Sequence, residues 1–232
     1  MEQTKIIESE IAKSIGRLLR DSFGKGPDAV FVSIGLPYVI AHLRNFLSPM
    51  EKVLIEQNQE PMLRLAREAV MRNLTPKIGA IFKEIAQLEL TELLYEWDFD
   101  NKSAVLVASC SPAGHASPFY SAVPTKDLPP RKLKQLSAMK SEDIASYHIN
   151  TRTLLVIKRG ILGAVEKQFI EQGQEEQLKH ALQTLESKGL ARIIALIEKT
   201  LDIKIHESFI LWSLPQNMSL LVFILYPPSG KT

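Results

Sequence analysis

The side chains that could do chemistry are few in this sequence, and they are scattered. Its five histidines stand alone, because none has a second histidine four residues away on a helix, where both could bind a metal ion. Cys110 is the only cysteine, which excludes a disulfide or a cysteine-built metal site within one chain. No serine has the Gly-x-Ser-x-Gly setting of a nucleophile. We therefore expect no catalytic residues, no metal, no cofactor and no enzymatic activity.

A short turn, Gly24-Lys25-Gly26-Pro27, is the first stretch that could bind something. Glycine commonly ends a helix and proline cannot continue one, so the turn has a structural explanation. Lys25 could in addition supply a positive charge to an anion or to a partner protein. The end of the preceding helix carries negative partial charge, which disfavours a phosphate held there by the backbone. Both interpretations stay open.

Two stretches rich in glutamate and glutamine form the other candidate. EKVLIEQNQE begins at Glu51 and EKQFIEQGQE at Glu166, 115 positions later, and they agree at seven of ten positions. A paired acid–base role is less economical than a surface ion pair, because Lys52 and Glu56 are four residues apart on a predicted helix. A solvated surface does not explain why the glutamines persist. We therefore predict that the two stretches face each other, through Glu56, Gln57, Gln59, Glu171, Gln172 and Gln174.

The similarity between these stretches continues along most of the chain at the same offset. Arg44 falls on Arg159, and Trp97 falls on Trp212, which are the only two tryptophans. Internal similarity at a fixed spacing predicts two copies of one structural unit. We expect the copies to fold on each other as a fused pseudo-two-fold dimer, and single-copy relatives to form homodimers.

The elements that must position these residues follow from the apolar pattern. A helix is predicted over 6–23, because its apolar residues fall on one helical stripe. A hairpin follows over 29–47, and the Ser48-Pro49 pair with Glu51 has the form of a capping box that opens the next helix. A long helix is predicted over 60–88, broken or kinked near 73–76, before a second hairpin. The unit is therefore α-β-β-α-α-β-β, an α+β fold with an antiparallel sheet covered by helices on one face.

Domain boundaries are predicted from composition. The first domain spans 1–110 and a second, degenerate copy spans 131–232. Residues 111–130 hold five of the 13 prolines, which is typical of a semi-extended linker.

Bulk composition narrows the class of partner. The chain is 45% hydrophobic and 23% charged, and its net charge of +2 is too small to indicate nucleic acid as a partner. Residues 208–230 contain no charged side chain, but Pro215-Gln216-Asn217 stands near their middle, so two strands around a turn are favoured over a membrane span. The N-terminus lacks the apolar core of a signal peptide. We expect a cytoplasmic protein, without membrane insertion, that can lie at the membrane periphery.

One family shares this order of motifs. A helix, Gly-Lys-Gly-Pro, a hairpin, Leu47-Ser48-Pro49-x-Glu51-Lys52-x-Leu54 and an arginine-bearing helix with Arg64 and Arg67 resemble the bacterial MpsC family. That family is named for a component of a sodium-translocating, membrane-potential-generating system linked to inorganic-carbon uptake, and has no known enzymatic activity. The resemblance covers 5–110, and the second copy is a degenerate version with Leu182 in place of Arg67. It points to Gly24, Lys25, Gly26, Pro27, Ser48, Pro49, Glu51 and Arg67.

Taken with the resemblance, the sequence predicts an accessory or regulatory protein that docks on a partner protein, such as the cytoplasmic face of a membrane transporter. An alternative is a sensor that binds a small anion or metabolite between the copies, with Lys25, Arg44 and Arg67 as charge donors. A homo-oligomer is compatible with both.

Overall fold

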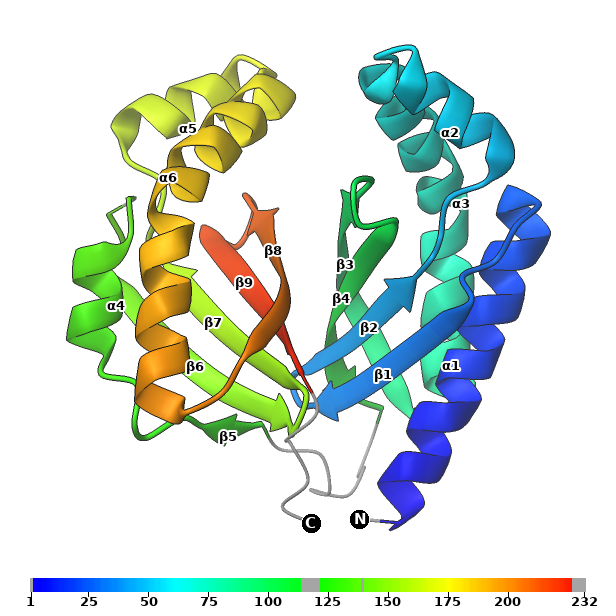
Figure 1. The fold of residues 1–232 in the computed structure, drawn as a ribbon, viewed down its shortest axis with the longest axis horizontal. Coiled ribbons are helices and arrows are strands. Elements are labelled where there is room, and N and C mark those ends of the chain that lie inside the picture. The colour runs from blue at the N-terminus through cyan, green and yellow to red at the C-terminus, as the bar shows by residue number, and fades with distance from the viewer. Residues whose placement is uncertain (1, 114–121, 139, 227–232) are drawn as a thin grey trace. The chain divides into compact units, whose positions relative to one another are not determined.

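The computed structural model describes residues 2–113, 122–138 and 140–226. Its contacts divide the chain into two compact units, Met1–Ala122 and Val123–Thr232, each described here by itself. Each unit combines helices with one antiparallel sheet (Figure 1). The predicted α+β class is confirmed.

The first unit has the predicted order of elements. They are α1 (Glu2–Phe23), β1 (Ala29–Gly35), β2 (Tyr38–Arg44), α2 (Pro49–Glu56), α3 (Glu60–Ala86), β3 (Leu88–Asp98) and β4 (Ser103–Pro112). The strand order in the sheet is β1-β2-β4-β3, so β1 and β3 are the edge strands.

The second unit repeats this order after a shortened entry. Its elements are β5 (Val123–Pro124), α4 (Pro130–Leu136), β6 (Asp143–Asn150), β7 (Thr153–Arg159), α5 (Ala164–Glu171), α6 (Glu175–Leu201), β8 (Ile205–Ser213) and β9 (Met218–Leu225). The strand order is β5-β6-β7-β9-β8. The charge-free stretch forms β8 and β9 around a turn, as predicted. Among the described residues, no helix has the length and apolar character needed to cross a membrane.

The two units agree in detail at the offset of 115. Helix α5 begins and ends 115 residues after α2, and α6 does so after α3. The β-bulge in β3 falls at Thr91, and the bulge in β8 falls at its counterpart, His206. Eight left-handed residues also coincide in four pairs, namely Asn45 with Gly160, Asn58 with Gly173, Gln87 with Asp202, and Lys102 with Asn217. Shared irregularities of this kind are strong support for a duplication, because regular strands and helices alone would not require them.

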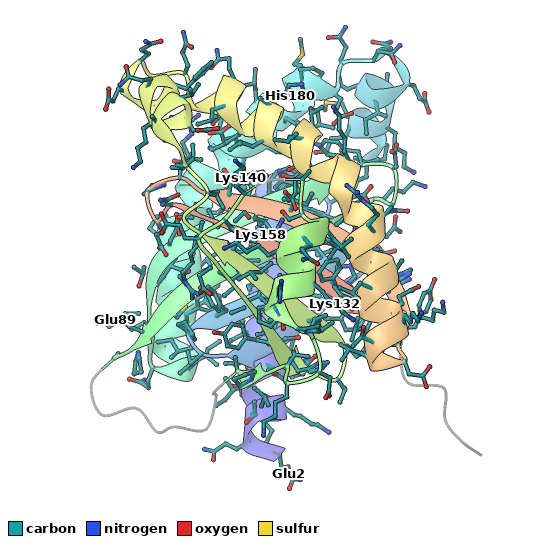
Figure 2. All side chains as sticks on the ribbon, turned by 90° about the vertical axis from the view of Figure 1, so that its left-hand side faces the viewer. Glu2, Glu89, Lys132, Lys140, Lys158 and His180 are labelled. Atoms are coloured by element: carbon teal, nitrogen blue, oxygen red, sulfur yellow. The ribbon has the colours of Figure 1, made fainter. Side chains whose placement is uncertain are left out.

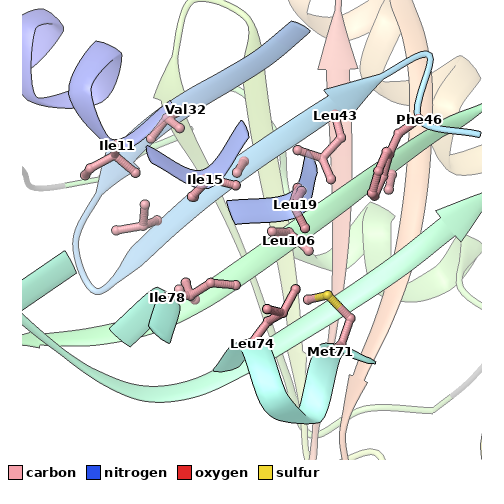
Figure 3. Packing of buried hydrophobic residues seen from close by; sticks show 14 of the residues in the cluster. Ile11, Ile15, Leu19, Val32, Leu43, Phe46, Met71, Leu74, Ile78 and Leu106 are labelled. Atoms are coloured by element: carbon pink, nitrogen blue, oxygen red, sulfur yellow. The ribbon is translucent and has the colours of Figure 1, made fainter. Parts of the chain in front are cut away.

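The core of the first unit lies between its sheet and the helices α1 and α3. Ile11, Ile15 and Leu19 of α1 are fully buried, as the predicted stripe requires. They meet Leu43 of β2 and Met71 of α3 (Figure 3). This packing fixes where α1 ends and where α3 passes the sheet, and so positions the candidate site.

Of the break or kink predicted in the long helix, the break is wrong, because α3 is one continuous helix, and the kink stays a prediction. Helix α3 continues through Pro76, although proline lacks the N–H that would bond the carbonyl of Arg72. Tertiary packing of Leu74 and Ile78 on both sides of the proline holds the helix together. In α6, Gly189 serves close approach instead of a break, because a Cβ there would lie 2.9 Å from the Leu136 carbonyl oxygen.

The predicted linker, residues 111–130, needs a correction at both ends, and at its N-terminal end Ser111 and Pro112 are still part of β4. Val123 and Pro124 form β5 and pair with β6, and Leu128 is buried in the core of the second unit. Residues 123–130 therefore belong to the second unit, because they add an edge strand to its sheet, bury Leu128 in its core and lead into α4 at Pro130. The predicted linker's residues 114–121 lie outside the described residues.

Candidate functional site

The candidate residues of the first unit converge around Arg67, a side chain of α3 that is only 2% exposed. Its Nε donates to Oε1 of Glu51 at 2.8 Å, and one terminal nitrogen donates to Oε2 of the same carboxylate at 2.9 Å. That nitrogen also donates to the Phe46 carbonyl oxygen at 2.8 Å. A two-point arginine–carboxylate contact is the strong form of an ion pair, because both partners are held in one plane.

Four aromatic rings surround the same guanidinium. Its carbon lies 4.5 Å from the ring centre of Trp97, 4.6 Å from Phe46, 5.4 Å from Phe99 and 5.5 Å from Phe23. Each distance is within the range of a cation–π contact. The rings come from four segments, α1, the β2–α2 loop, β3 and the β3–β4 turn, so no local motif could reveal the cluster.

Glu51 joins this cluster to the start of α2. Its Oε2 accepts from the Ser48 amide at 2.7 Å, while the Ser48 hydroxyl accepts from the Glu51 amide at 3.3 Å, which is the predicted capping box. Burial alone would raise the pKa of Glu51. Hydrogen bonds from Arg67 and Ser48, together with the Arg67 charge, outweigh burial and lower that pKa. The carboxylate is therefore held ionised as part of the fold.

The Gly24–Pro27 turn lies beside the cluster. Gly24 has φ +72°, a left-handed conformation that ends α1 as predicted. Lys25 Nζ donates to the Leu47 carbonyl oxygen at 3.2 Å, next to the Ser48 cap. Gly26 and Pro27 are buried. The structure thus brings together seven of the eight first-unit candidates, Gly24, Lys25, Gly26, Pro27, Ser48, Glu51 and Arg67.

Arg44 is the candidate that does not join them. Leu43, its neighbour in β2, packs in the helix-side core, and side chains alternate along a strand, so Arg44 points to the other face of the sheet. Arg67 is also unsuited to the role of an anion donor, because its guanidinium is buried and already bonded. The predicted donor set of Lys25, Arg44 and Arg67 is therefore not assembled within the first unit.

The second unit fills the corresponding place with aliphatic side chains. Leu182 replaces Arg67, Ile161 replaces Phe46, and Leu214 replaces Phe99, while Trp212 stays at the position of Trp97. Glu166, the counterpart of Glu51, still accepts from the N-cap amide, that of Gly163, at 2.9 Å. The arginine that pairs with Glu51 is replaced by Leu182. The arginine cluster is thus specific to the first unit.

A different buried ion pair stands in the second unit. Lys158 of β7 and Glu186 of α6 are both fully buried and bonded to each other, and Lys158 Nζ also donates to the Ser137 hydroxyl at 2.7 Å. Figure 2 labels Lys158 within this unit. Burial lowers the pKa of Lys158 to about 7. At the offset of 115 their counterparts are Leu43 and Met71, two apolar residues of the first core. Sequence reasoning missed this pair, although the offset comparison contains it.

The predicted repeat-interface residues lie at the tight turns between helices. Gln57 follows α2 and Gln59 precedes α3, just as Gln172 follows α5 and Gln174 precedes α6. The backbone N–H of Gln59 donates to the Leu54 carbonyl oxygen, and that of Gln174 donates to the Phe169 carbonyl oxygen, both at 2.8 Å. Glu56 and Glu171 end α2 and α5. All six are exposed or at helix ends, and the contact between them stays a prediction.

Two further observations bear on chemistry. Burial raises the pKa of the Cys110 thiol to about 12, so it is protonated and unreactive at neutral pH. Among the described residues, no three histidine, cysteine or acidic side chains are grouped closely enough to hold a metal ion.

Comparison with known proteins places the chain in a family. No curated protein and no solved structure matches it. A family model described as "Na+-translocating membrane potential-generating system (MpsC)" matches residues 3–111 and again residues 134–226. The two matched segments fall on the two structural units, so the chain is a tandem member of the MpsC family.

Proposed function

We propose that this chain is a non-enzymatic accessory protein that docks on a partner protein through the helical corner of its first unit. The helical corner is formed by α2 and the first turns of α3, which Figure 1 shows beyond the end of the strands. The family description names a Na+-translocating membrane potential-generating system, which supports a partner that belongs to such a system.

The observation that carries the proposal is the set of large apolar side chains exposed at this corner. Met50 is 76% exposed, Leu65 67%, Met62 57% and Val53 49%. Met50 and Val53 are three residues apart on α2, and Met62 and Leu65 are three apart on α3, so each pair lies on one face of its helix. Single exposed apolar residues are common, but four on two consecutive helices support the proposal of an association surface here.

The chemistry of these side chains fits a protein partner. Methionine is unbranched and polarisable, so it adapts its shape to a partner surface. Helix α2 buries none of its residues fully, although Leu54 and Ile55 pack against the core, so much of its surface is open to a partner. A partner would remove this apolar surface from water, which is favourable by roughly 25 cal/mol per Å².

The second unit has a weaker version of the corner. Val165 of α5, the counterpart of Met50, is 68% exposed, and Phe169 is 37% exposed. The counterparts of Met62 and Leu65 are Gln177 and His180, which are polar. We therefore place the principal contact on the first unit.

The experiment is affinity capture from the native cell, with and without detergent, using Met50→Asp and Leu65→Asp variants. Ile6→Asp is the matched control, because Ile6 is 55% exposed on α1, away from the corner. The proposal expects one specific partner that wild type and the control retain and that both corner variants lose. Retention by the corner variants would reject this surface, and no specific partner under either condition would reject the docking function.

The anion-sensor alternative loses its main support in the form predicted from sequence. It required Arg67 as a donor, and that guanidinium is bonded to Glu51 inside the fold.

A further inference from the structure

We propose that a groove between α1 and β1 of the first unit binds a multiply charged, phosphate-bearing ligand. The proposal uses residues outside the helical corner and does not depend on the docking function.

The groove consists of two adjoining hollows of about 500 and 470 Å³. They share Arg20, Pro27 and Asp28, and lie where α1 runs beside the edge strand β1 (Figure 1). Both hollows are wide open to solvent, so a ligand there would be held by charge at the surface and not enclosed.

Positive side chains line this groove without being used elsewhere. Lys13, Arg17 and Arg20 are exposed and line the hollows from one side of α1. None of the three forms a hydrogen bond or ion pair with any residue in the described part of the chain. Lys25 adds a fourth positive charge, and the only carboxylate in the lining is that of Asp28, which already accepts from the Asn45 amide. The lining therefore carries four positive charges against one negative.

The spacing of the cations selects the class of ligand. Seven residues separate Lys13 from Arg20, which corresponds to about 10 Å along a helix axis. A single carboxylate can bridge only neighbouring cations such as Arg17 and Arg20, whereas linked phosphates extend further along the row towards Lys13. The guanidinium group matches phosphate oxygens with two parallel hydrogen bonds, which favours phosphate at Arg17 and Arg20.

The Gly24–Pro27 turn, which the second copy lacks in its sequence, helps to form the groove. A Cβ on Gly26 would lie 3.0 Å from Cβ of Arg20 and 3.2 Å from the Gly16 carbonyl oxygen, so glycine lets the turn lie against α1. The turn thereby closes one end of the groove beside Arg20. The second unit has only the seven-residue helix α4 in place of α1, and its sequence has Met139-Lys140-Ser141-Glu142 at the positions that correspond to Gly24–Pro27. If Gly24-Lys25-Gly26-Pro27 served the core alone, we would expect it in both copies. A ligand site in the first unit explains why only the first copy has it.

The test is titration calorimetry of the full chain with inorganic phosphate and pyrophosphate, and sedimentation with phosphatidylcholine vesicles with and without phosphatidic acid. Arg17→Gln and Arg20→Gln each remove one charge-assisted contact and should weaken pyrophosphate binding roughly tenfold. Arg72→Gln is the matched control, because Arg72 is an exposed arginine of α3 outside the groove. Circular dichroism checks that all variants fold.

Each outcome decides the proposal. Binding of pyrophosphate with loss in both groove variants supports a free ligand. Binding only to vesicles containing phosphatidic acid, with the same losses, supports a lipid headgroup as the source of the phosphate. No binding in either arm would overturn the proposal, and so would equal weakening by Arg72→Gln, which would indicate general charge attraction.

Discussion

The buried pair Lys158–Glu186 can be exchanged for the residues that its own duplicate uses. We consider Lys158→Leu, Glu186→Met and the double variant, which carry the side chains of Leu43 and Met71 at the offset of 115. In the first unit these two residues are fully buried in one apolar core. The first unit thus shows that a leucine and a methionine can fill the position that Lys158 and Glu186 occupy in the second unit.

The expected magnitudes follow from burial. Either single variant leaves one charge fully buried without its partner, which costs about 3–5 kcal/mol. That loss is a large part of the stability of an ordinary domain, about 5–15 kcal/mol. The double variant removes both charges together, so its change in stability should be between zero and a gain of about 1–4 kcal/mol. The double-mutant cycle should therefore be strongly non-additive.

The assay is denaturant unfolding followed by tryptophan fluorescence. The chain has two tryptophans, Trp97 in the first unit and Trp212 in the second. A Trp97→Phe background leaves Trp212 as the reporter of the second unit. Additive losses in the double variant would refute the reasoning, because they would show that the second core needs its charges for more than mutual compensation.

The same pair predicts a pH dependence. Burial lowers the pKa of Lys158 to about 7, whereas its ordinary value is 10.5. Between these pH values the unfolded chain binds more protons than the folded one, so stability should rise with pH from about 7 to 10.5. The double variant should lack this rise, and an identical rise in both proteins would contradict the assignment to Lys158.

Three other predictions concern the duplicated elements. Arg67→Leu should destabilise the first unit by about 3–5 kcal/mol, measured through Trp97, because Glu51 loses its partner; an unchanged midpoint would contradict the role of the pair. The pKa of Glu51 is lowered, so its contribution to stability is present above pH 4.5 and is lost as the pH falls further. In Glu51→Gln, the free energy of unfolding should therefore depend less on pH in this acid range. Gly173 has φ +71° with nothing near its missing Cβ, so Gly173→Ala should cost about 1 kcal/mol in thermal unfolding, whereas Gly173→Asn, as at Asn58, should cost less; equal losses would argue against backbone strain.

The sequence predicted the order of elements well, because the apolar periods of 2 and 3.6 are local. The capping box at Ser48 and the glycine end of α1 are local in the same way. Pro76 misled the prediction, since tertiary packing overrode its cost within α3. The aromatic surroundings of Arg67 could not be predicted, because their rings meet only after four segments fold together.

The two units fill the same core position differently, with Leu43 and Met71 in the first and the ion pair Lys158–Glu186 in the second, and this difference has a consequence for how a tandem chain assembles. If α6 packed on the first sheet, Glu186 would face Leu43 with no cation, and if α3 packed on the second sheet, Lys158 would face Met71. Either exchange would bury an uncompensated charge. We expect this mismatch to direct each long helix to its own sheet, which guards against the misassembly that threatens proteins built from repeats.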